Sequence, residues 1–262
     1  MITYDGKYFE PKATLECGQV FRYEKLGDED YGIISKDKAA RVYRKGDTTY
    51  IDTDDAEYFE NYFDLSTDYA AITERLSAFD ELKEKVEFGK GIRILRQDFD
   101  ETVLSFIISA NNNIPRIKGI IERLAENFGR DMGEYRAFPT LQELADVSIE
   151  TYRKLGCGFR DRYLSGTVKT MLTTDISERI KAADTPTARK LLCTLSGVGG
   201  KVADCILLFA LKRTDSYPVD TWIFKSNKSD VLDTPEKVRR HYLDRYGADA
   251  GYAQQYLFYD VR

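Results

Sequence analysis

The spacing of hydrophobic and polar residues changes near residue 54. Before that point, short segments rich in β-branched and aromatic residues alternate with turn dipeptides such as Gly46-Asp47. This pattern predicts an antiparallel meander with strands over residues 19–24, 31–35, 40–44 and 48–51. From Asp54 onward, apolar residues recur every three or four positions, which is the spacing of amphipathic helices.

The helical pattern continues to the end of the chain. Several segments begin with Asp, a good N-cap, and Pro186 and Pro235 lie near helix starts, where proline is tolerated. We expect helices over residues 54–63, 68–88, 98–110, 114–128, 140–145, 148–155, 161–172, 187–195, 201–211, 221–225, 235–246 and 250–259. The sequence therefore predicts an α+β fold, with a small N-terminal antiparallel β-sheet domain (residues 1–90, with flanking helices) and a larger all-α domain (residues 91–262).

The composition is that of a folded protein with a sizeable core. The chain has 262 residues, of which 42% are apolar and 32% are charged. No apolar run approaches the roughly 20 residues that a membrane-spanning helix needs. Residues 1–12 are mixed and polar, unlike a signal peptide, so the expected location is the cytoplasm of a bacterium or archaeon.

The cysteine and histidine counts limit the kinds of metal and catalytic site that the chain can form. The four cysteines stand at positions 17, 157, 193 and 205, without the short spacings of a zinc site or an iron–sulfur cluster. The single histidine, His241, lies in a charged stretch that is typical of a solvated helix face. A catalytic site would therefore depend on lysine, carboxylate, cysteine, tyrosine or serine side chains.

The net charge of −5 is unevenly distributed along the chain. Residues 1–90 contain 13 basic and 21 acidic side chains, whereas residues 91–262 contain 26 basic and 23 acidic ones. The excess of acid belongs to the first third, so the later part of the chain remains able to bind phosphate.

A glycine-rich hairpin joins two predicted helices at residues 195–201. Gly197, Gly199 and Gly200 permit positive φ and a close approach of the backbone, and the hairpin amides open the second helix. Such a helix start attracts an anion such as phosphate, although the loop carries no side chain that reads a base edge. A tight turn that binds nothing is equally consistent with the glycines alone.

Lys201 and Asp220 are the strongest candidates for catalysis. Lys201 stands in the first turn of a helix, where the macrodipole disfavours a cation and favours the neutral, nucleophilic amine. A surface lysine that touches phosphate is the simpler alternative. Asp220 follows Pro218-Val219 and precedes a short predicted helix. It is therefore either an N-cap or a carboxylate that orients water, moves protons or stabilises a cation.

Several separated segments resemble one protein family. LSGVGGKVAD at residues 195–204 and PVD at residues 218–220 resemble the hairpin and Gly-Pro-Asp regions of the helix-hairpin-helix DNA glycosylase superfamily. Further segments are similar to motifs of its 8-oxoguanine DNA glycosylase/AP lyase family: GQVFR at 18–22, SANNNIPR at 109–116, LGCGFRDRY at 155–163, and AQ at 253–254 with Phe258. They occur in the family's order from about residue 15 to residue 260, which is nearly the whole chain.

The resemblance implies a bifunctional DNA repair enzyme on a helix-hairpin-helix glycosylase fold. Lys201 matches the nucleophile that attacks the anomeric carbon of the damaged nucleotide, displaces the base and leaves a Schiff base that eliminates and nicks the strand. Asp220 matches the superfamily's essential aspartate. The implied partner is double-stranded DNA containing 8-oxoguanine, bound by a monomer, and catalysis requires no cofactor and no iron–sulfur cluster.

The resemblance also implies how the base is read once it has left the duplex. The Gly18 carbonyl would accept a hydrogen bond from N7–H, which 8-oxoguanine has and guanine lacks. Gln254 would read the Watson–Crick edge, and Phe258 and Cys205 would stack on the two faces of the base. Without the resemblance, Phe258 and Cys205 would be taken for ordinary helix core.

Four further matched residues would contact DNA. Asn111 would fill the space that the base vacates, although three consecutive asparagines also suit a plain helix stop. Arg116, Phe159 and Arg160 would probe the orphaned partner base and wedge the strand. A surface arginine and a core phenylalanine are the alternatives.

The hairpin has two implied ligands. Its backbone would bind phosphate at Gly197, Val198, Gly199 and Gly200. Its backbone carbonyls would hold a structural, non-catalytic cation at Cys193, Leu195 and Val198. The chain departs from the family pattern at Trp222 (a histidine in eukaryotic members), at Phe159 (a tyrosine) and at Gly200 (a larger residue).

Three other functions compete with this interpretation. A lyase for oxidised pyrimidines usually carries a C-terminal cluster of four cysteines, which this sequence lacks. A glycosylase for alkylated bases would normally lack Lys201. A non-catalytic DNA-binding hairpin module would explain the glycines but not the pair of Lys201 and Asp220.

Overall fold

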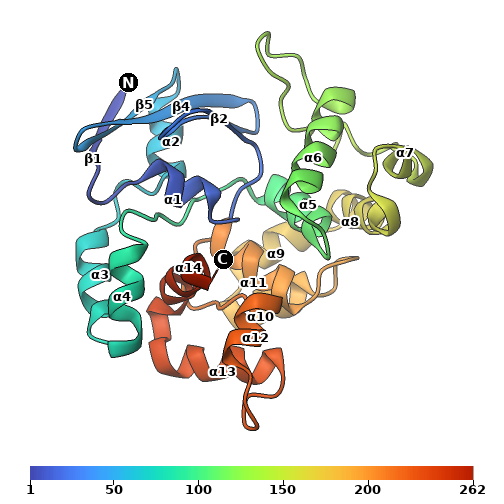
Figure 1. Cartoon of the computed structure of the whole chain (residues 1–262). Coiled ribbons are helices and arrows are strands. Elements are labelled where there is room, and N and C mark those ends of the chain that lie inside the picture. Colours follow the sequence, from blue (N-terminus) through green and yellow to red (C-terminus); the bar gives the residue numbers. More distant parts are fainter. Residues whose placement is uncertain (262) are drawn as a thin grey trace.

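An antiparallel sheet forms the N-terminal part of the computed structural model, which describes residues 1–261 (Figure 1). Its strands run in the order β1-β5-β4-β3-β2. Their bounds are β1 (Ile2–Asp5), β2 (Tyr23–Gly27), β3 (Asp30–Ser35), β4 (Lys38–Lys45) and β5 (Thr48–Asp52). The predicted antiparallel sheet is confirmed, with β1 as an added edge strand that pairs Ile2 with Ile51. Arg262, the last residue of the expected helical domain, lies outside the described residues.

The first predicted strand begins later than its pattern suggests, because residues 18–22 form a loop. Gln19 is completely buried and fixes this loop. Its side-chain amide donates to the carbonyl of Arg93 (2.8 Å) and accepts from the N–H of Leu95 (2.9 Å). A buried side chain therefore satisfies backbone groups that strand pairing would otherwise satisfy.

Two short helices, α1 (Pro11–Glu16) and α2 (Ala56–Tyr62), pack with the sheet. Alternate residues of β3 are buried, as expected for a strand with one face toward a core. The apolar core of this part joins strand and helix residues, among them Leu15, Ile33, Val42 and Phe59. The α1 helix was not foreseen, because a proline-led segment of six residues carries little periodicity.

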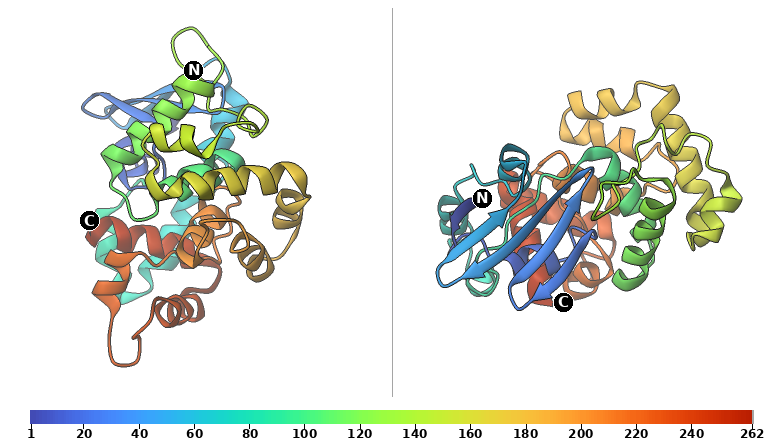
Figure 2. Two further views of the ribbon diagram at one scale, coloured as in Figure 1. Left: turned by 90° about the vertical axis from the view of Figure 1, so that its right-hand side faces the viewer. Right: turned by 90° about the horizontal axis from the view of Figure 1, so that it is seen from above.

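The rest of the described chain is mostly helical, and its helices lie below the sheet and to its right in Figure 1 (Figures 1 and 2). The helices are α3 (Tyr69–Ser77), α4 (Asp80–Phe88), α5 (Phe99–Ser109), α6 (Ile114–Phe128), α7 (Ile149–Lys154), α8 (Asp161–Thr173), α9 (Ile176–Ala182), α10 (Thr185–Leu192), α11 (Gly200–Phe209), α12 (Thr221–Asn227), α13 (Pro235–Tyr246) and α14 (Ala250–Val261). Single 3₁₀ turns occupy Gly158–Arg160 and Gly247–Asp249. Within residues 1–261, no helix is both long enough and apolar enough to cross a membrane.

The predicted helices differ most from the observed ones at three places. The segment 68–88 forms two helices, because Phe79 is extended (ψ 116°) and packs its ring edge-on against Tyr246 at 5.0 Å. Residues 140–145 form turns instead of a helix. The α9 helix was missed because its seven residues contain only two buried positions, Ile176 and Ile180.

Buried apolar side chains form two clusters. The smaller one belongs to the sheet, α1 and α2, whereas the larger one includes α3 and α4 together with the later helices. Arg93, which is completely buried, joins the two parts: its guanidinium donates to the carbonyls of Phe63 (2.7 Å) and Tyr8 (3.0 Å) and lies over the ring of Tyr69. The boundary expected at residue 90 stays a prediction.

Candidate active site

The glycine hairpin joins α10 to α11 and owes its shape to two glycines. Gly197 has φ of +81°, and a Cβ there would come within 2.7 Å of the Tyr163 ring. Gly199 caps α11 without a side-chain hydrogen bond. The amides of the first turn of α11 are therefore left to bind an external acceptor, as the sequence predicts for a phosphate site.

Gly200 lies against a network of charged side chains that leaves no room for a Cβ. A Cβ on Gly200 would lie 2.6 Å from the guanidinium of Arg189. Arg189 and Arg239 both bind the buried carboxylate of Asp204, at 2.9 and 3.0 Å. Asp204 lies on α11 one turn after Lys201, so this network fixes the helix that carries the candidate nucleophile. The sequence analysis did not identify it.

The structure brings Lys201 and Asp220 to one place. Both side chains line an inner cavity and also the open groove outside it. The amine of Lys201 lies 5.3 Å from the ring centre of Phe106. Asp220 is the N-cap of α12, and its Oδ1 accepts a hydrogen bond from the N–H of Ile223 at 2.8 Å. The two alternatives for Asp220 are thus compatible, because the cap occupies one carboxylate oxygen.

The inner cavity lies between α11, α14 and the loop after α1. Its lining contains the predicted base-reading residues Gly18, Cys205, Gln254 and Phe258. It also contains residues that the sequence analysis did not single out: Cys17, Phe106, Phe209, Pro218 and Gln255. Its volume is about 40 Å³, small beside the roughly 300–1,000 Å³ of typical ligand pockets. A base can therefore enter only if side chains at its mouth move.

The polar groups of this cavity are few and well defined. Gly18 has φ of +84°, which favours glycine, and the buried Gln19 next to it fixes the loop. Burial raises the pKa of the Cys205 thiol to about 11, although the nearby Lys201 opposes the shift. Cys205 therefore remains a neutral thiol near pH 7. Gln254 is almost fully buried.

The asparagine loop after α5 forms the opposite side of the open groove. Asn111 is exposed and has φ of +51°, a conformation that asparagine tolerates better than most residues. Arg160 is buried, and its guanidinium donates to the carbonyls of Ala110 (2.8 Å) and Asn111 (2.7 Å). Arg160 thus holds the loop that presents Asn111. Whether it also contacts DNA stays a prediction.

Two aromatic side chains stand exposed near the groove. Phe159 is 56% exposed, with the guanidinium of Arg160 lying 4.3 Å from its ring centre. Trp222, which lines the groove itself, is 60% exposed. Arg116 is also exposed and donates to the carbonyl of Gly156 at 3.3 Å. Such exposed aromatic and cationic groups suit contact with bases and phosphates.

No group of three histidine, cysteine or acidic side chains that could hold a metal ion occurs in residues 1–261. Three of the cysteines, Cys17, Cys157 and Cys205, are buried, whereas Cys193 is exposed at the C-cap of α10. At the predicted cation site, the carbonyl of Leu195 accepts a hydrogen bond from the N–H of Val198 at 3.2 Å.

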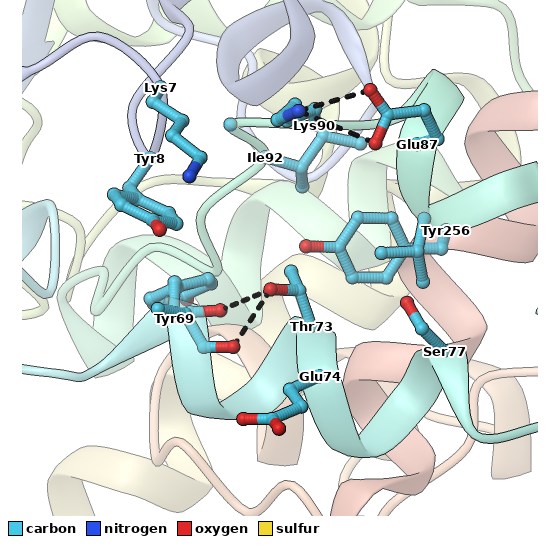
Figure 3. Close-up of a pocket in the computed structure, with 13 residues that line it drawn as sticks. Lys7, Tyr8, Tyr69, Thr73, Glu74, Ser77, Glu87, Lys90, Ile92 and Tyr256 are labelled. Atoms are coloured by element: carbon cyan, nitrogen blue, oxygen red, sulfur yellow. Dashed lines mark hydrogen bonds and ion pairs between the residues drawn. The ribbon is translucent and has the colours of Figure 1, made fainter. Parts of the chain in front are cut away.

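A second cavity, of about 230 Å³, lies on the other side of α14 (Figure 3). Its walls come from α3, α4 and the N-terminal segment, and include Lys7, Tyr69 and Tyr256. The Tyr256 hydroxyl points into it and has no hydrogen-bond partner within the described chain. Lys201 and Asp220 do not line it.

Comparison with known proteins identifies the family. Residues 1–103 match the family model described as 8-oxoguanine DNA glycosylase, N-terminal domain, and residues 104–245 match that of the HhH-GPD superfamily base excision DNA repair protein. The N-glycosylase/DNA lyase OGG1 of Arabidopsis thaliana is 31% identical over 277 residues, which are 94% of this chain and 75% of the relative. The chain belongs to the 8-oxoguanine DNA glycosylase family. The resemblance that the motifs indicate is confirmed.

Solved structures of the 8-oxoguanine DNA glycosylase family share the whole fold. The 8-oxoguanine glycosylase/lyase of Clostridium acetobutylicum, in complex with double-stranded DNA containing cytosine opposite 8-oxoguanine, is 38% identical, with a TM-score of 0.91 over 97% of this chain and 92% of that one. MBOgg1, in complex with a low affinity DNA ligand, is 39% identical, with a TM-score of 0.90 over 98% and 93%.

Proposed function

We propose that this protein is a bifunctional DNA repair glycosylase that excises 8-oxoguanine from duplex DNA and then nicks the strand as an AP lyase. The observation that carries the proposal is that an amine and a carboxylate, Lys201 and Asp220, share the wall of one cavity with the predicted base-reading groups. Family membership supports the same activity. The Cys205 thiol, which burial keeps neutral, does not compete with Lys201 as a nucleophile.

The chemistry assigned to Lys201 is a substitution followed by an elimination. Its neutral amine forms a bond to C1′ of the damaged nucleotide, the glycosidic bond breaks, and its electron pair leaves with the base. The sugar ring opens to a protonated Schiff base. Loss of a C2′ proton then expels the 3′ phosphate, and water releases the lysine. Asp220 is placed to stabilise the cationic character at C1′ or to move a proton.

Base recognition follows from the cavity lining. The Gly18 carbonyl accepts from N7–H of 8-oxoguanine, whereas guanine would present a lone pair there and repel it. Gln254 hydrogen-bonds the Watson–Crick edge. The base then lies between Phe258 and Cys205. All four groups line the same cavity as Lys201, which supports these roles.

DNA contacts are assigned to the faces around the groove. Asn111 would occupy the space that the base leaves, supported by its exposed position across the groove from Lys201. Arg116 and Phe159 would reach the orphaned base, with Arg160 acting through the loop that it holds. The hairpin backbone from Gly197 to Gly200 would bind a phosphate through the amides of Gly197, Gly199 and Gly200, because the amide of Val198 already donates to the Leu195 carbonyl.

The remaining expectations belong to the same proposal. The protein would act as a monomer on genomic DNA, at the nucleoid in a bacterial or archaeal cytoplasm. Catalysis would need no cofactor. The carbonyls of Cys193, Leu195 and Val198 would hold a structural cation that stiffens the hairpin, which is consistent with their position at its base.

Borohydride trapping on a duplex with one 8-oxoguanine tests the proposal directly. We expect a covalent protein–DNA adduct with the wild type and with Lys190→Gln, an exposed control on α10, and none with Lys201→Gln. If neither the wild type nor Lys190→Gln forms an adduct although both still bind DNA, the lyase mechanism is wrong. A non-catalytic module, or a glycosylase that uses water, would then be favoured. Adducts only on duplexes with oxidised pyrimidines or alkylated bases would instead change the substrate class.

A further inference from the structure

Two adjacent glutamines on α14 form a buried hydrogen-bonded pair. Gln254 and Gln255 are only 3% and 2% exposed, and both line the inner cavity beside Lys201. The Nε2 of Gln255 donates to the Oε1 of Gln254 over 2.7 Å. A buried amide left unsatisfied costs about 1–3 kcal/mol, so this pairing strongly favours one orientation of each amide relative to the other.

The far end of Gln255 reaches the loop that carries Gly18. Its Oε1 lies 3.5 Å from the sulfur of Cys17, and that sulfur accepts from the Nε2 of Gln19 at 3.3 Å. The thiol hydrogen has two acceptors within reach, the carbonyl of Thr14 at 3.2 Å and the Oε1 of Gln255, and Gln255 faces the sulfur with its oxygen. The amide nitrogen of Gln255 then points to Gln254.

This arrangement leaves Gln254 with a defined polarity. Its Oε1 accepts from Gln255, and its Nε2 donates to no residue of the described chain. The nitrogen therefore remains to donate to a ligand, while the second lone pair of the oxygen remains to accept. An amide held in this way presents one fixed order of donor and acceptor.

The order of donor and acceptor distinguishes the two oxidised purines. 8-Oxoguanine presents an acceptor at O6 and a donor at N1–H, whereas 8-oxoadenine presents a donor at N6 and an acceptor at N1. The same two positions are reversed, so an amide that pairs with one edge has to turn over to pair with the other. Both bases carry the N7–H that Gly18 would recognise.

We propose that Gln255 is a positioning residue that determines specificity, because it prevents the Gln254 amide from turning over and so selects the guanine edge over the adenine edge. The proposal rests on the proposed function, in which Gln254 faces the extruded base. Gln255 itself acts through Gln254. Cys17, which contacts Gln255, belongs to the same loop as Gly18. The two groups that read the base, Gln254 and Gly18, are therefore held in place together.

Two variants of Gln255 test whether it fixes the orientation of the Gln254 amide. Gln255→Met keeps the volume and removes both hydrogen bonds, so the Gln254 amide can adopt either orientation. Gln255→Glu, assayed at pH 8, offers only acceptors to Gln254 and therefore favours the reversed orientation. The measurement is kcat/KM for excision of 8-oxoguanine and of 8-oxoadenine from otherwise identical duplexes, with the exposed Gln142→Met as control.

We expect the ratio of 8-oxoguanine to 8-oxoadenine excision to fall about tenfold in Gln255→Met and further in Gln255→Glu, as for the loss of one discriminating hydrogen bond. Strand nicking of an abasic duplex, in which there is no base to orient, is the internal reference and should change far less. An unchanged ratio in both variants overturns the proposal, and so does an equal loss of excision and nicking. If the wild type itself leaves 8-oxoguanine intact, it is the proposed function that fails.

Discussion

Asp220 has two tasks that different substitutions can separate. Its Oδ1 caps α12, and the rest of the carboxylate faces the cavity. Asparagine is as good an N-cap as aspartate but carries no charge. We expect Asp220→Asn to keep the free energy of unfolding, whereas Asp220→Ala loses about 1 kcal/mol. Both should slow base excision about 100-fold or more.

Urea unfolding and single-turnover excision of 8-oxoguanine measure the two effects side by side. Thr234→Ala provides a matched cap control, because Thr234 caps α13 in the same way and does not line the cavity. It should lose stability without losing excision. Excision by Asp220→Asn within threefold of the wild-type rate would mean that the carboxylate acts only as a cap.

At the residue scale, the sequence predicted the residues that line the cavity better than the residues that hold them in place. Lys201, Asp220, Gly18, Gln254, Phe258 and Cys205 were all foreseen and line one cavity. Gln255 and the Asp204 network were missed, because a buried glutamine or aspartate on an apolar helix carries no sequence signal of its partner. Such partners come from distant segments, as Cys17 and Arg239 do.

The hairpin is the element to which we assign phosphate binding. We expect Gly197→Ala to destabilise the protein by roughly 2–4 kcal/mol and to weaken DNA binding at least tenfold, because its φ is positive and its Cβ would strike Tyr163. Gly199→Ala has open space and an ordinary φ of −91°, so it should cost at most about 1 kcal/mol as a poorer cap.

Fluorescence anisotropy with a duplex at two salt concentrations checks the hairpin prediction. The wild-type affinity should fall as salt rises, since phosphate contacts release counterions. Equal affinity of the two glycine variants would show that the hairpin does not touch DNA.

At the element scale, the sequence predicts long periodic segments well. The α6 and α13 helices begin and end where their patterns do. Short elements such as β1, α1 and α9 were missed because four to seven residues establish no period. The break at Phe79 depends on packing against Tyr246, which is 167 residues away in sequence. The local pattern of apolar residues cannot reveal such a contact.

At the scale of the whole molecule, Glu101 ties the helical part to the sheet. It is buried on α5 and accepts from the N–H of Lys36, which follows β3, at 2.8 Å. Burial raises its pKa from 4.5 to about 7, against the attraction of Arg22. The native state thus holds this proton more tightly than the unfolded chain, so stability falls as pH rises from about 4.5 to 7.

Glu101→Gln removes this titration and keeps an acceptor for Lys36. We expect the variant to be more stable than the wild type at pH 8, by on the order of 3 kcal/mol, with most of the gain lost at pH 5. Chemical denaturation at the two pH values measures it. A difference between variant and wild type that is the same at both pH values would contradict the role of Glu101.

The placement of the four thiols gives the molecule a built-in reporter. Cys193 alone is accessible, at the base of the hairpin, so Ellman's reagent should titrate one thiol in the native protein and four in denaturant. A fluorophore attached there would sit beside the turn that we propose to bind DNA, without any engineered cysteine. Its signal on mixing would time the docking of the hairpin separately from the later chemistry at Lys201.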